Sequence, residues 1–284
     1  MIIVADSGST KCDWAIVEND GYIISVFSTI GFNPYFHSKE FILKELHLNR
    51  GHFPPLKRVE KVFFYGAGAS ASHLNKVLNE ALSYFFPQAK VEVEHDLVGA
   101  AYATYDGKPA ISCILGTGSN SCFFDGKKIH EEVPSLAYIL GDEGSGSYFG
   151  RALLRDYFYK RLPKEIVDPF VKEFEPSKDK VIHSVYKEAH ANVYLASYMN
   201  FISTFKEHPH IKKMIEKGLN EFIDIHIKCF KNYQDVPVHF VGSVGYFCED
   251  ILRKVAKENK FTIGKIEKKP IDGLIEYHLK YKLD

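Results

Sequence analysis

Two stretches of the chain follow one design, in which an apolar run, a turn of glycine and hydroxyl residues and a second apolar run succeed one another. The first occupies residues 2–17 with its turn at Gly8, and the second occupies residues 110–126 with its turn at Gly116 and Gly118. Apolar runs joined by so short a turn predict a β-hairpin. Because the design occurs twice, the sequence predicts an internal duplication and two domains built alike.

The turn of the first hairpin has the chemistry of a phosphate-binding loop. Gly8 lets the backbone bend close to a ligand, and Ser7, Ser9 and Thr10 add hydroxyl groups to the free backbone N–H groups of the turn. An ordinary tight hairpin with a capped turn would explain the same residues. On the phosphate interpretation, each of the two domains offers one phosphate-binding turn to a cleft between them.

Asp6 ends the first apolar run, immediately before this turn. A carboxylate at the end of a buried strand is costly unless it faces a cation. Mg²⁺ carried on the bound phosphates is a cation that suits this position. We therefore expect the Asp6 carboxylate to face a bound Mg²⁺ ion.

The composition restricts the kind of ligand. The chain has 284 residues, of which 45% are apolar, enough for one large domain or two of ordinary size. Thirty-six basic residues balance 36 acidic ones, so the formal net charge is zero. This balance disfavours a nucleic-acid or anionic-membrane partner and favours a small molecule bound between two domains.

Five cysteines are scattered along the chain, without a C-x-x-C pair: Cys12, Cys113, Cys122, Cys229 and Cys248. They lack the spacing of a zinc or iron–sulfur site and are expected to be small buried residues in a reducing compartment. No basic leader precedes the first apolar run, and no segment approaches the ~20 apolar residues of a membrane span. We expect a cytoplasmic protein with no membrane partner.

Strands and helices alternate after the first hairpin. A third strand is expected at residues 22–28, a buried strand that runs into a glycine turn at 61–68, a helix at 74–85, a strand at 91–96 and a further helix from residue 97. This βαβα order favours a central sheet with flanking helices, which is an α/β fold.

Asp96 lies where a strand ends and a helix begins. Open α/β sheets bind ligands at this edge, although helix capping is the commoner reason for an aspartate in such a place. His95 is expected to point to the opposite face and to be structural. Asn33, in the loop before Pro34, could present its amide to a polar ligand or bond its own backbone.

An Asp-Gly-Lys-Pro turn marks a domain boundary. We expect a first domain at residues 1–106 and a second at 107–284. A helical pattern at about 150–232 forms an insertion in the second domain. A terminal helix near residues 270–277 could cross back to the first domain.

The second domain contains two further glycine-rich turns. Asp142 lies among glycines at the start of a helix, where it could bind a substrate or metal-bound water, or cap the helix. A third apolar run enters a turn at Gly242 and Gly245. Those glycines permit close approach of an adenine or ribose, and tight packing of strand on helix would also explain them.

This order of motifs resembles the superfamily of actin, Hsp70 and sugar kinases over essentially the whole chain. Residues 6–10 match its first phosphate motif, residues 115–121 its second and residues 240–245 its adenosine motif. Residues 116–120 and 141–145 are similar to the N-acetylglucosamine kinase branch, the BadF/BadG/BcrA/BcrD ATPase family. The resemblance implies two ribonuclease H-like domains of the actin-like ATPase fold, with mixed five-stranded sheets flanked by helices and a helical insertion in the second.

The resemblance also implies an ATP-dependent kinase that transfers the γ-phosphoryl group to the 6-hydroxyl of N-acetylglucosamine or a closely related amino sugar. Asp96 would be the catalytic base, and Asp6 would orient Mg²⁺ through water. The sugar would be bound by Asn33, Asp96, Ser119, Asn120 and Asp142. The nucleotide would be bound by Ser7, Gly8, Ser9, Thr10, Lys11, Gly116, Thr117, Gly118, Gly242, Ser243 and Tyr246. Related kinases suggest a homodimer.

One departure from the family concerns the sugar. Vertebrate N-acetylglucosamine kinases carry Gly-Trp-Gly where this chain has Ser135, Leu136 and Ala137. The change removes an aromatic wall and two flexible backbone contacts near the sugar. The identity of the sugar therefore stays open, and glucosamine and N-acetylmuramate are alternatives.

Two other classes of function compete with the kinase. An ATPase activator or switch would use nucleotide closure to move a partner protein, but such activators hold an iron–sulfur cluster that the scattered cysteines cannot supply. A catalytically silent sugar-binding regulator is disfavoured because Asp96 is retained.

Overall fold

The computed structural model describes residues 1–282 and divides into two compact units. Unit 1 contains Met1–Lys108 and the chain from Lys269 onward, and unit 2 contains Pro109–Lys268. The sequence had placed the corresponding boundary between residues 106 and 107. The C-terminal helix, which falls in the range assigned to the second domain, belongs to unit 1.

Unit 1 is built on a five-stranded sheet with the order β3-β2-β1-β4-β5. Its strands are β1 (Ile2–Ser7), β2 (Lys11–Val17), β3 (Ile23–Ile30), β4 (Lys61–Gly66) and β5 (Lys90–His95). Its helices are α1 (Lys39–Leu48), α2 (Ser72–Phe85), α3 (Asp96–Thr104) and α13 (Ile271–Tyr281), with short turns η1 (Arg50–His52) and η2 (Leu56–Arg58). The first three strands are antiparallel, whereas β1, β4 and β5 are parallel, so the sheet is mixed.

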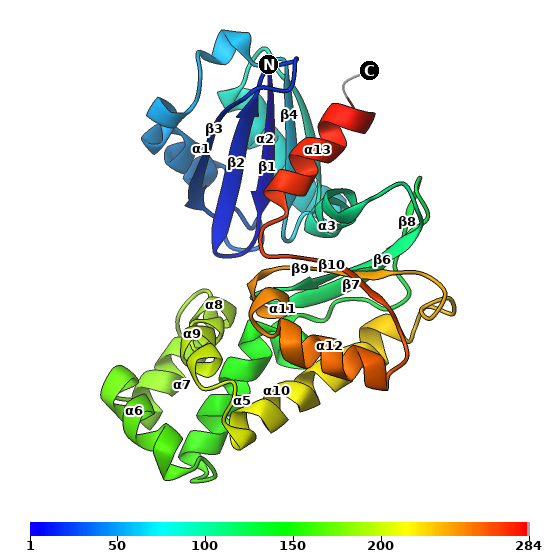
Figure 1. The fold of residues 1–284 in the computed structure, drawn as a ribbon. Coiled ribbons are helices and arrows are strands. Elements are labelled where there is room, and N and C mark those ends of the chain that lie inside the picture. Colours follow the sequence, from blue (N-terminus) through cyan, green and yellow to red (C-terminus); the bar gives the residue numbers. More distant parts are fainter. Residues whose placement is uncertain (283–284) are drawn as a thin grey trace. The chain divides into compact units, whose positions relative to one another are not determined.

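Helices cover both faces of this sheet (Figure 1). The side chains of β1 alternate between the two faces, as strand geometry requires. Ile3 and Ala5 belong to the core under α1 and α2, which also holds the fully buried Trp14. Ile2 and Val4 belong to the core under α3 and α13. Because β1 is buried on both faces, its sequence is an almost continuous apolar run.

The parallel strands bring three strand ends to one edge of the sheet. Ser7 at the end of β1 pairs with Gly66 at the end of β4, and Gly66 pairs with His95 at the end of β5. The first hairpin turn and the start of α3 therefore lie at the same edge, where sheets of this type bind ligands.

Unit 2 repeats the plan with the order β10-β9-β6-β7-β8. Its strands are β6 (Ala110–Leu115), β7 (Ser119–Phe124), β8 (Ile129–His130), β9 (Val238–Val241) and β10 (Ile263–Glu267). β6 pairs antiparallel with β7 and parallel with β9, as β1 does with β2 and β4. The duplication inferred from the two hairpins thus extends to the whole sheet.

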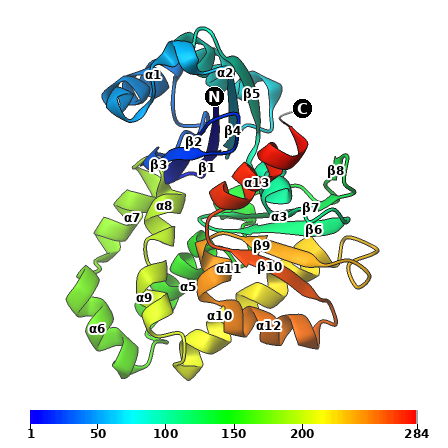
Figure 2. The same cartoon turned by 45° about the horizontal axis from the view of Figure 1, so that its top comes forward.

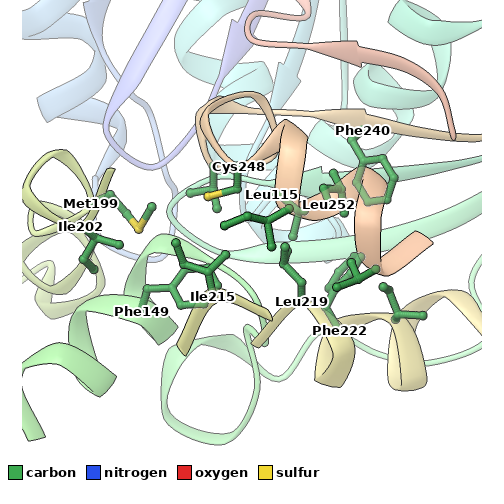
Figure 3. Close-up of a cluster of buried hydrophobic side chains, with 14 of the residues drawn as sticks. Leu115, Phe149, Met199, Ile202, Ile215, Leu219, Phe222, Phe240, Cys248 and Leu252 are labelled. Atoms are coloured by element: carbon green, nitrogen blue, oxygen red, sulfur yellow. The ribbon is translucent and has the colours of Figure 1, made fainter. Parts of the chain in front are cut away.

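The helices of unit 2 are α4 (Ala137–Leu140), α5 (Gly146–Phe158), α6 (Lys164–Phe174), α7 (Lys178–Tyr186), α8 (Ala191–Ala196), α9 (Met199–Thr204), α10 (Pro209–Phe222), α11 (Ser243–Phe247) and α12 (Glu249–Glu258). A π-helical turn, η3 (Ile223–Ile227), continues α10. Side chains of the sheet and of these helices meet in one core, in which Leu115 and Phe240 pack with Phe149, Leu219 and Leu252 (Figure 3). This core fixes α5 and α10 on the sheet.

The helices α6 to α9 form the outer part of the insertion expected at about 150–232, and they lie to one side of the unit 2 sheet (Figure 2). The expected fold, two mixed five-stranded sheets flanked by helices with a helical insertion in the second, is confirmed. Neither β8 nor β10 has a separate signal in the sequence pattern. In the part of the chain from residue 1 to 282, none of the helices has the length and apolar character needed to span a membrane.

Candidate active site

The turn of the first hairpin forms as predicted. β1 ends at Ser7 and β2 starts at Lys11, so Gly8, Ser9 and Thr10 make the tip. The N–H of Gly8 donates to the carbonyl of Lys11 over 2.9 Å and closes the turn. Thr10 is exposed, and Gly8 and Ser9 are partly exposed. The tip is therefore accessible to a ligand.

Ser7 connects this turn to the loop that carries Asn33. The hydroxyl of Ser7 is fully buried and accepts the N–H of Phe32 over 2.8 Å. Asn33 is buried as well, and its Oδ1 accepts the N–H of Tyr35 over 3.0 Å. Asn33 thus lies beside the hairpin turn and makes the backbone bond that the sequence left as the alternative to ligand binding.

Carboxylates accumulate around Asp6. Asp6 lies directly opposite Asp13 in the register of the hairpin. The Asp13 carboxylate accepts a hydrogen bond from the Ser28 hydroxyl over 2.6 Å and lies 2.6 Å from Nζ of Lys11. Burial and then the charges of Asp96 and Asp13 raise the pKa of Asp6 from its ordinary value of 3.8 to about 8. A nearby cation would favour the ionised form.

These groups fit a hydrated Mg²⁺ ion. Carboxylate oxygens are the ligands that Mg²⁺ prefers, and the ion usually keeps several waters and shares phosphate oxygens of a nucleotide. A dication beside Asp6 would offset the repulsion among Asp6, Asp13 and Asp96. Asp6 is the group that would face it, through water.

The raised pKa of Asp6 predicts an unusual dependence of stability on pH. Between pH 4 and pH 8 the folded protein keeps a proton on Asp6 that the unfolded chain has released, so the free energy of unfolding falls as the pH rises through this window. An Asp6→Asn variant lacks this loss. We expect it to melt higher than the wild type by about 2–5 °C at pH 8 without Mg²⁺, and by less at pH 6.

Scanning calorimetry at several pH values measures this difference. Asp272→Asn is the control, because Asp272 is exposed in the same unit. A wild type and an Asp6→Asn variant with parallel pH profiles would show that the Asp6 carboxyl titrates normally.

Asp96 is the first residue of α3 and follows His95, the last residue of β5. Its carboxylate does not cap the helix, since His95 occupies the N-cap position. Nε2 of His95 lies 3.0 Å from Oδ1 of Asp96. The expectation that His95 points to the opposite face is therefore wrong, because the chain changes from strand to helix between the two residues and the strand alternation ends.

The second hairpin turn is tied to the start of α5. β6 ends at Leu115 and β7 starts at Ser119, so residues 116–118 make the tip. The carbonyls of Gly116 and Thr117 accept the N–H groups of Gly146 (2.8 Å) and Ser147 (3.1 Å). These two bonds hold the hairpin turn and the first turn of α5 together.

Asp142 reaches the same hairpin from the loop before α5. It is buried, its Oδ1 accepts the N–H of Ser119 over 3.1 Å, and a Cβ on Gly118 would lie 2.9 Å from that oxygen. Its backbone has a φ of 59°, a left-handed conformation that costs energy for a residue with a Cβ. Burial raises the pKa of Asp142 to about 6. These contacts fix the carboxylate of Asp142, while its backbone is held in a strained conformation.

Ser119 and Asn120 are buried at the start of β7. The Ser119 hydroxyl donates to the carbonyl of Glu143 over 2.8 Å, and Oδ1 of Asn120 accepts the N–H of Ser121 over 2.8 Å. The second hairpin and the loop of Asp142 are thus joined by both the backbone and the side chain of Ser119.

The third glycine turn follows β9. Gly242 has a φ of 117°, and its N–H donates to the carbonyl of Glu267 over 2.8 Å. A Cβ on Gly242 would lie 2.8 Å from the carbonyl carbon of Leu115 and closer to its oxygen. Ser243 and Tyr246 on α11 are exposed. This turn therefore packs on the end of β6, beside the second hairpin turn.

The predicted residues form two sets, one in each unit. Unit 1 holds Asp6, Ser7, Gly8, Ser9, Thr10, Lys11, Asn33 and Asp96, and unit 2 holds Gly116, Thr117, Gly118, Ser119, Asn120, Asp142, Gly242, Ser243 and Tyr246.

Four neighbours of these residues were missed. They are Asp13, His95, Glu143 and His226. Asp13 had a signal, since it mirrors Asp6 about the hairpin turn. No sequence pattern links His226 to the site, because it is far from Glu143 in the sequence.

The duplicated mixed sheet, with a glycine turn in each hairpin, defines a protein of the actin-like ATPase fold, the fold found in sugar kinases. A solved structure from Porphyromonas gingivalis, of a protein provisionally named an N-acetylglucosamine kinase, matches with a TM-score of 0.93 and 34% identity, covering 99% of each chain. The chain belongs to the same family as this Porphyromonas gingivalis protein.

Two more distant structures share the fold. A protein of Chromobacterium violaceum, also provisionally named an N-acetylglucosamine kinase, matches with a TM-score of 0.72 and 15% identity, covering 97% of this chain and 98% of its own. A ROK family glucokinase of Streptomyces griseus, solved with glucose and AMPPNP, matches with a TM-score of 0.54 and 17% identity, covering 97% of each chain. No family model and no curated protein matches the chain. Membership of the BadF/BadG/BcrA/BcrD branch therefore stays a prediction.

Proposed function

We propose that this protein is an ATP-dependent sugar kinase, which transfers the γ-phosphoryl group of ATP to the 6-hydroxyl of N-acetylglucosamine or a closely related amino sugar. The observation that carries the proposal is the pair of carboxylates Asp6 and Asp96, at the edge of the sheet where the glycine turn of the first hairpin lies. Whole-length similarity to the Porphyromonas gingivalis protein supports the amino sugar as the acceptor.

The residues of unit 1 supply a base, a phosphate-binding turn and a place for the metal ion. Asp96 accepts the proton of the sugar hydroxyl as its oxygen attacks the γ-phosphorus atom, and the bond to the β-phosphate oxygen breaks to release ADP. Mg²⁺, held through water by Asp6, neutralises charge on the phosphates when bound. The backbone N–H groups of Gly8, Ser9 and Thr10 bind phosphate oxygens, with Lys11 beside them.

The residues of unit 2 supply the other contacts. Asp142, Asn120 and Ser119 are the sugar-binding residues proposed in unit 2, and Asn33 is one proposed in unit 1. Gly116, Thr117 and Gly118 bind phosphate, and the nucleoside lies by Gly242, Ser243 and Tyr246. Such a set acts mainly by positioning and charge stabilisation, which is what phosphoryl transfer requires. The homodimer remains a prediction of the resemblance, and the cytoplasmic location remains a prediction from the cysteines and the apolar runs.

The segment before Asp142 bears on the choice of sugar. Leu136, Ile139 and Leu140 are all more than half exposed, and Ala137 has a φ of 56°. By the resemblance, Leu136 of this segment corresponds to the tryptophan of the Gly-Trp-Gly in vertebrate N-acetylglucosamine kinases. The exposed apolar segment favours a sugar with an apolar substituent, such as the acetyl group of N-acetylglucosamine, over a free amine.

The proposal is tested by incubating the protein with Mg-ATP and a panel of sugars. The panel contains glucose, glucosamine, N-acetylglucosamine, N-acetylmannosamine and N-acetylmuramate, and ADP release and phosphosugar are both measured. We expect phosphosugar with at least one N-acetylated sugar. ATP hydrolysis without any phosphosugar would favour a switch protein instead, and no ATP turnover at all would favour a silent regulator.

A Gly118→Ala variant tests the sugar site of unit 2. Its Cβ would lie 2.9 Å and 3.0 Å from the two carboxylate oxygens of Asp142, so the carboxylate has to move. We expect the KM for the sugar to rise by about tenfold, which corresponds to about 1.4 kcal/mol. The KM for ATP should change by much less. Gly51→Ala is the control, because nothing lies within 4 Å of its added Cβ and its φ is not positive. Equal KM values for the sugar in wild type and Gly118→Ala would contradict the assignment.

A further inference from the structure

A π-helical turn places a histidine in the core of unit 2. α10 ends at Phe222, and the turn η3 (Ile223–Ile227) continues it with a wider backbone spacing. The ring of His226 is buried and stacks on Phe222 with centroids 5.0 Å apart, while its carbonyl accepts the Ser121 hydroxyl over 2.6 Å. Single π-helical turns inside helices are frequent at functional sites. This one ends α10, and His226 lies on it.

The ring of His226 meets one ionisable partner. Its Nε2 lies 3.6 Å from Oε2 of Glu143, and the two side chains are 3% and 18% exposed. Its Nδ1 is buried without a hydrogen-bond partner among residues 1–282. Burial lowers the pKa of His226, so the ring is neutral near pH 7. A neutral ring with its proton on Nε2 directs an N–H at the Glu143 carboxylate and leaves Nδ1 unprotonated.

Glu143 follows Asp142, the strained residue proposed to bind the sugar. The backbone of this pair is held by Ser119, whose N–H donates to Asp142 and whose hydroxyl donates to the carbonyl of Glu143. The Glu143 carboxylate lies against the ring edge of His226, with Oε2 3.6 Å from Nε2, a polar contact longer than a hydrogen bond. A change in the φ of Asp142 rotates the Gly141–Asp142 peptide, the Asp142–Glu143 peptide or both, and the two bonds from Ser119 oppose rotation of the second.

We propose that His226 is a positioning residue for sugar binding, which acts through Glu143 and holds Asp142 in the conformation that binds the sugar. The inference rests on the proposed function for its kinetic consequences. Its structural part, that His226 restrains the loop of residues 141–145, is independent of the sugar. In the alternative, His226 is an ordinary core residue whose polar atoms matter only for stability.

Two variants of His226 distinguish a positioning role from a role in stability alone. His226→Phe keeps the aromatic packing on Phe222 and removes the N–H. His226→Gln keeps a donor at nearly the same reach. The control is His210→Phe, because Nε2 of His210 on α10 lies 3.2 Å from Oδ2 of Asp156, a second histidine–carboxylate pair in the same unit and outside the proposed site.

With the sugar that the wild type phosphorylates, we expect His226→Phe to raise the KM for the sugar by about tenfold and the KM for ATP by less than about twofold. His226→Gln should stay within about threefold of the wild type, and His210→Phe should match it. Glu143→Gln should show the same rise, and the double variant should add little to it because the two side chains act as one unit. Equal KM values for the sugar in His226→Phe and His210→Phe would overturn the inference.

Hydrogen exchange gives a readout that does not depend on activity. We expect the backbone amides of residues 141–145 to exchange faster in His226→Phe than in the wild type, and not in His210→Phe. Unchanged exchange in that loop would overturn the positioning role. If the wild-type protein phosphorylates none of the sugars, the proposed function is wrong. The hydrogen-exchange result would then decide alone whether His226 restrains the loop of residues 141–145.

Discussion

An Asp96→Asn variant is expected to lose about 1,000-fold in the rate of sugar phosphorylation, within the range that general bases contribute. The amide that replaces the carboxylate has nearly the same shape but cannot accept the hydroxyl proton at neutral pH. The sugar and nucleotide contacts of the other residues remain, so the loss should fall on kcat. Measuring initial rates of phosphosugar formation with saturating Mg-ATP tests this expectation.

The same variant should fold and bind nucleotide. The charge of Asp96 is the largest electrostatic contribution to the raised pKa of Asp6, so its removal relieves repulsion and does not create an unpaired buried charge. Binding of a fluorescent ATP analogue should therefore stay within about threefold of the wild type. Glu94→Gln is the matched control, because it removes an exposed carboxylate from β5, the strand that leads to Asp96. Turnover in Asp96→Asn within about tenfold of the wild type would remove Asp96 from the role of base.

The second large effect is expected for Gly242→Ala. Gly242 has a φ of 117°, which is unfavourable for a residue with a Cβ, and its added Cβ would overlap the backbone of Leu115. Neither the backbone of β6 nor that of β9 can yield easily, because the two strands pair in the centre of the unit 2 sheet. Backbone strain and overlap together should cost about 3 kcal/mol or more.

We expect Gly242→Ala to lower the Tm by about 6–12 °C and to weaken nucleotide binding, because the turn moves away from the end of β6. Gly245→Ala is the matched control one helical turn later. Its Cβ would meet its nearest neighbour, the Cβ of Phe240, at 3.5 Å, an ordinary contact, and alanine is the better helix former. If both variants melt like the wild type, the close packing of this turn on Leu115 does not exist in solution.

Local patterns explain why so much of the fold could be predicted. A strand buried on both faces, such as β1, must be a continuous apolar run, and a hairpin turn must contain residues that tolerate tight bends. Each of these two signals, the apolar run and the turn residues, is contained in a few neighbouring residues of the sequence. The same holds for the strand-end positions of Asp6 and Asp96, which follow from the limits of single elements.

Contacts between distant segments could not be predicted in this way. The error at His95 arose because strand alternation was carried one residue beyond the end of β5, where the helical backbone sends Asp96 back toward His95. The approach of His226 to Glu143 depends on the packing of η3 against β7 and on a π-helical turn, which has no sequence period of its own.

The sequence by itself determined the duplicated α/β plan, the two glycine turns and the strand-end carboxylates, because each depends on apolar spacing and turn chemistry over a few neighbouring residues. Only the tertiary structure decided which groups surround those carboxylates. Burial and then the charges of Asp96 and Asp13 raise the pKa of Asp6. Ser119 donates to Asp142, and His226 lies against Glu143. Their effects depend on distance and burial, which are set when strands and helices far apart in the chain pack together.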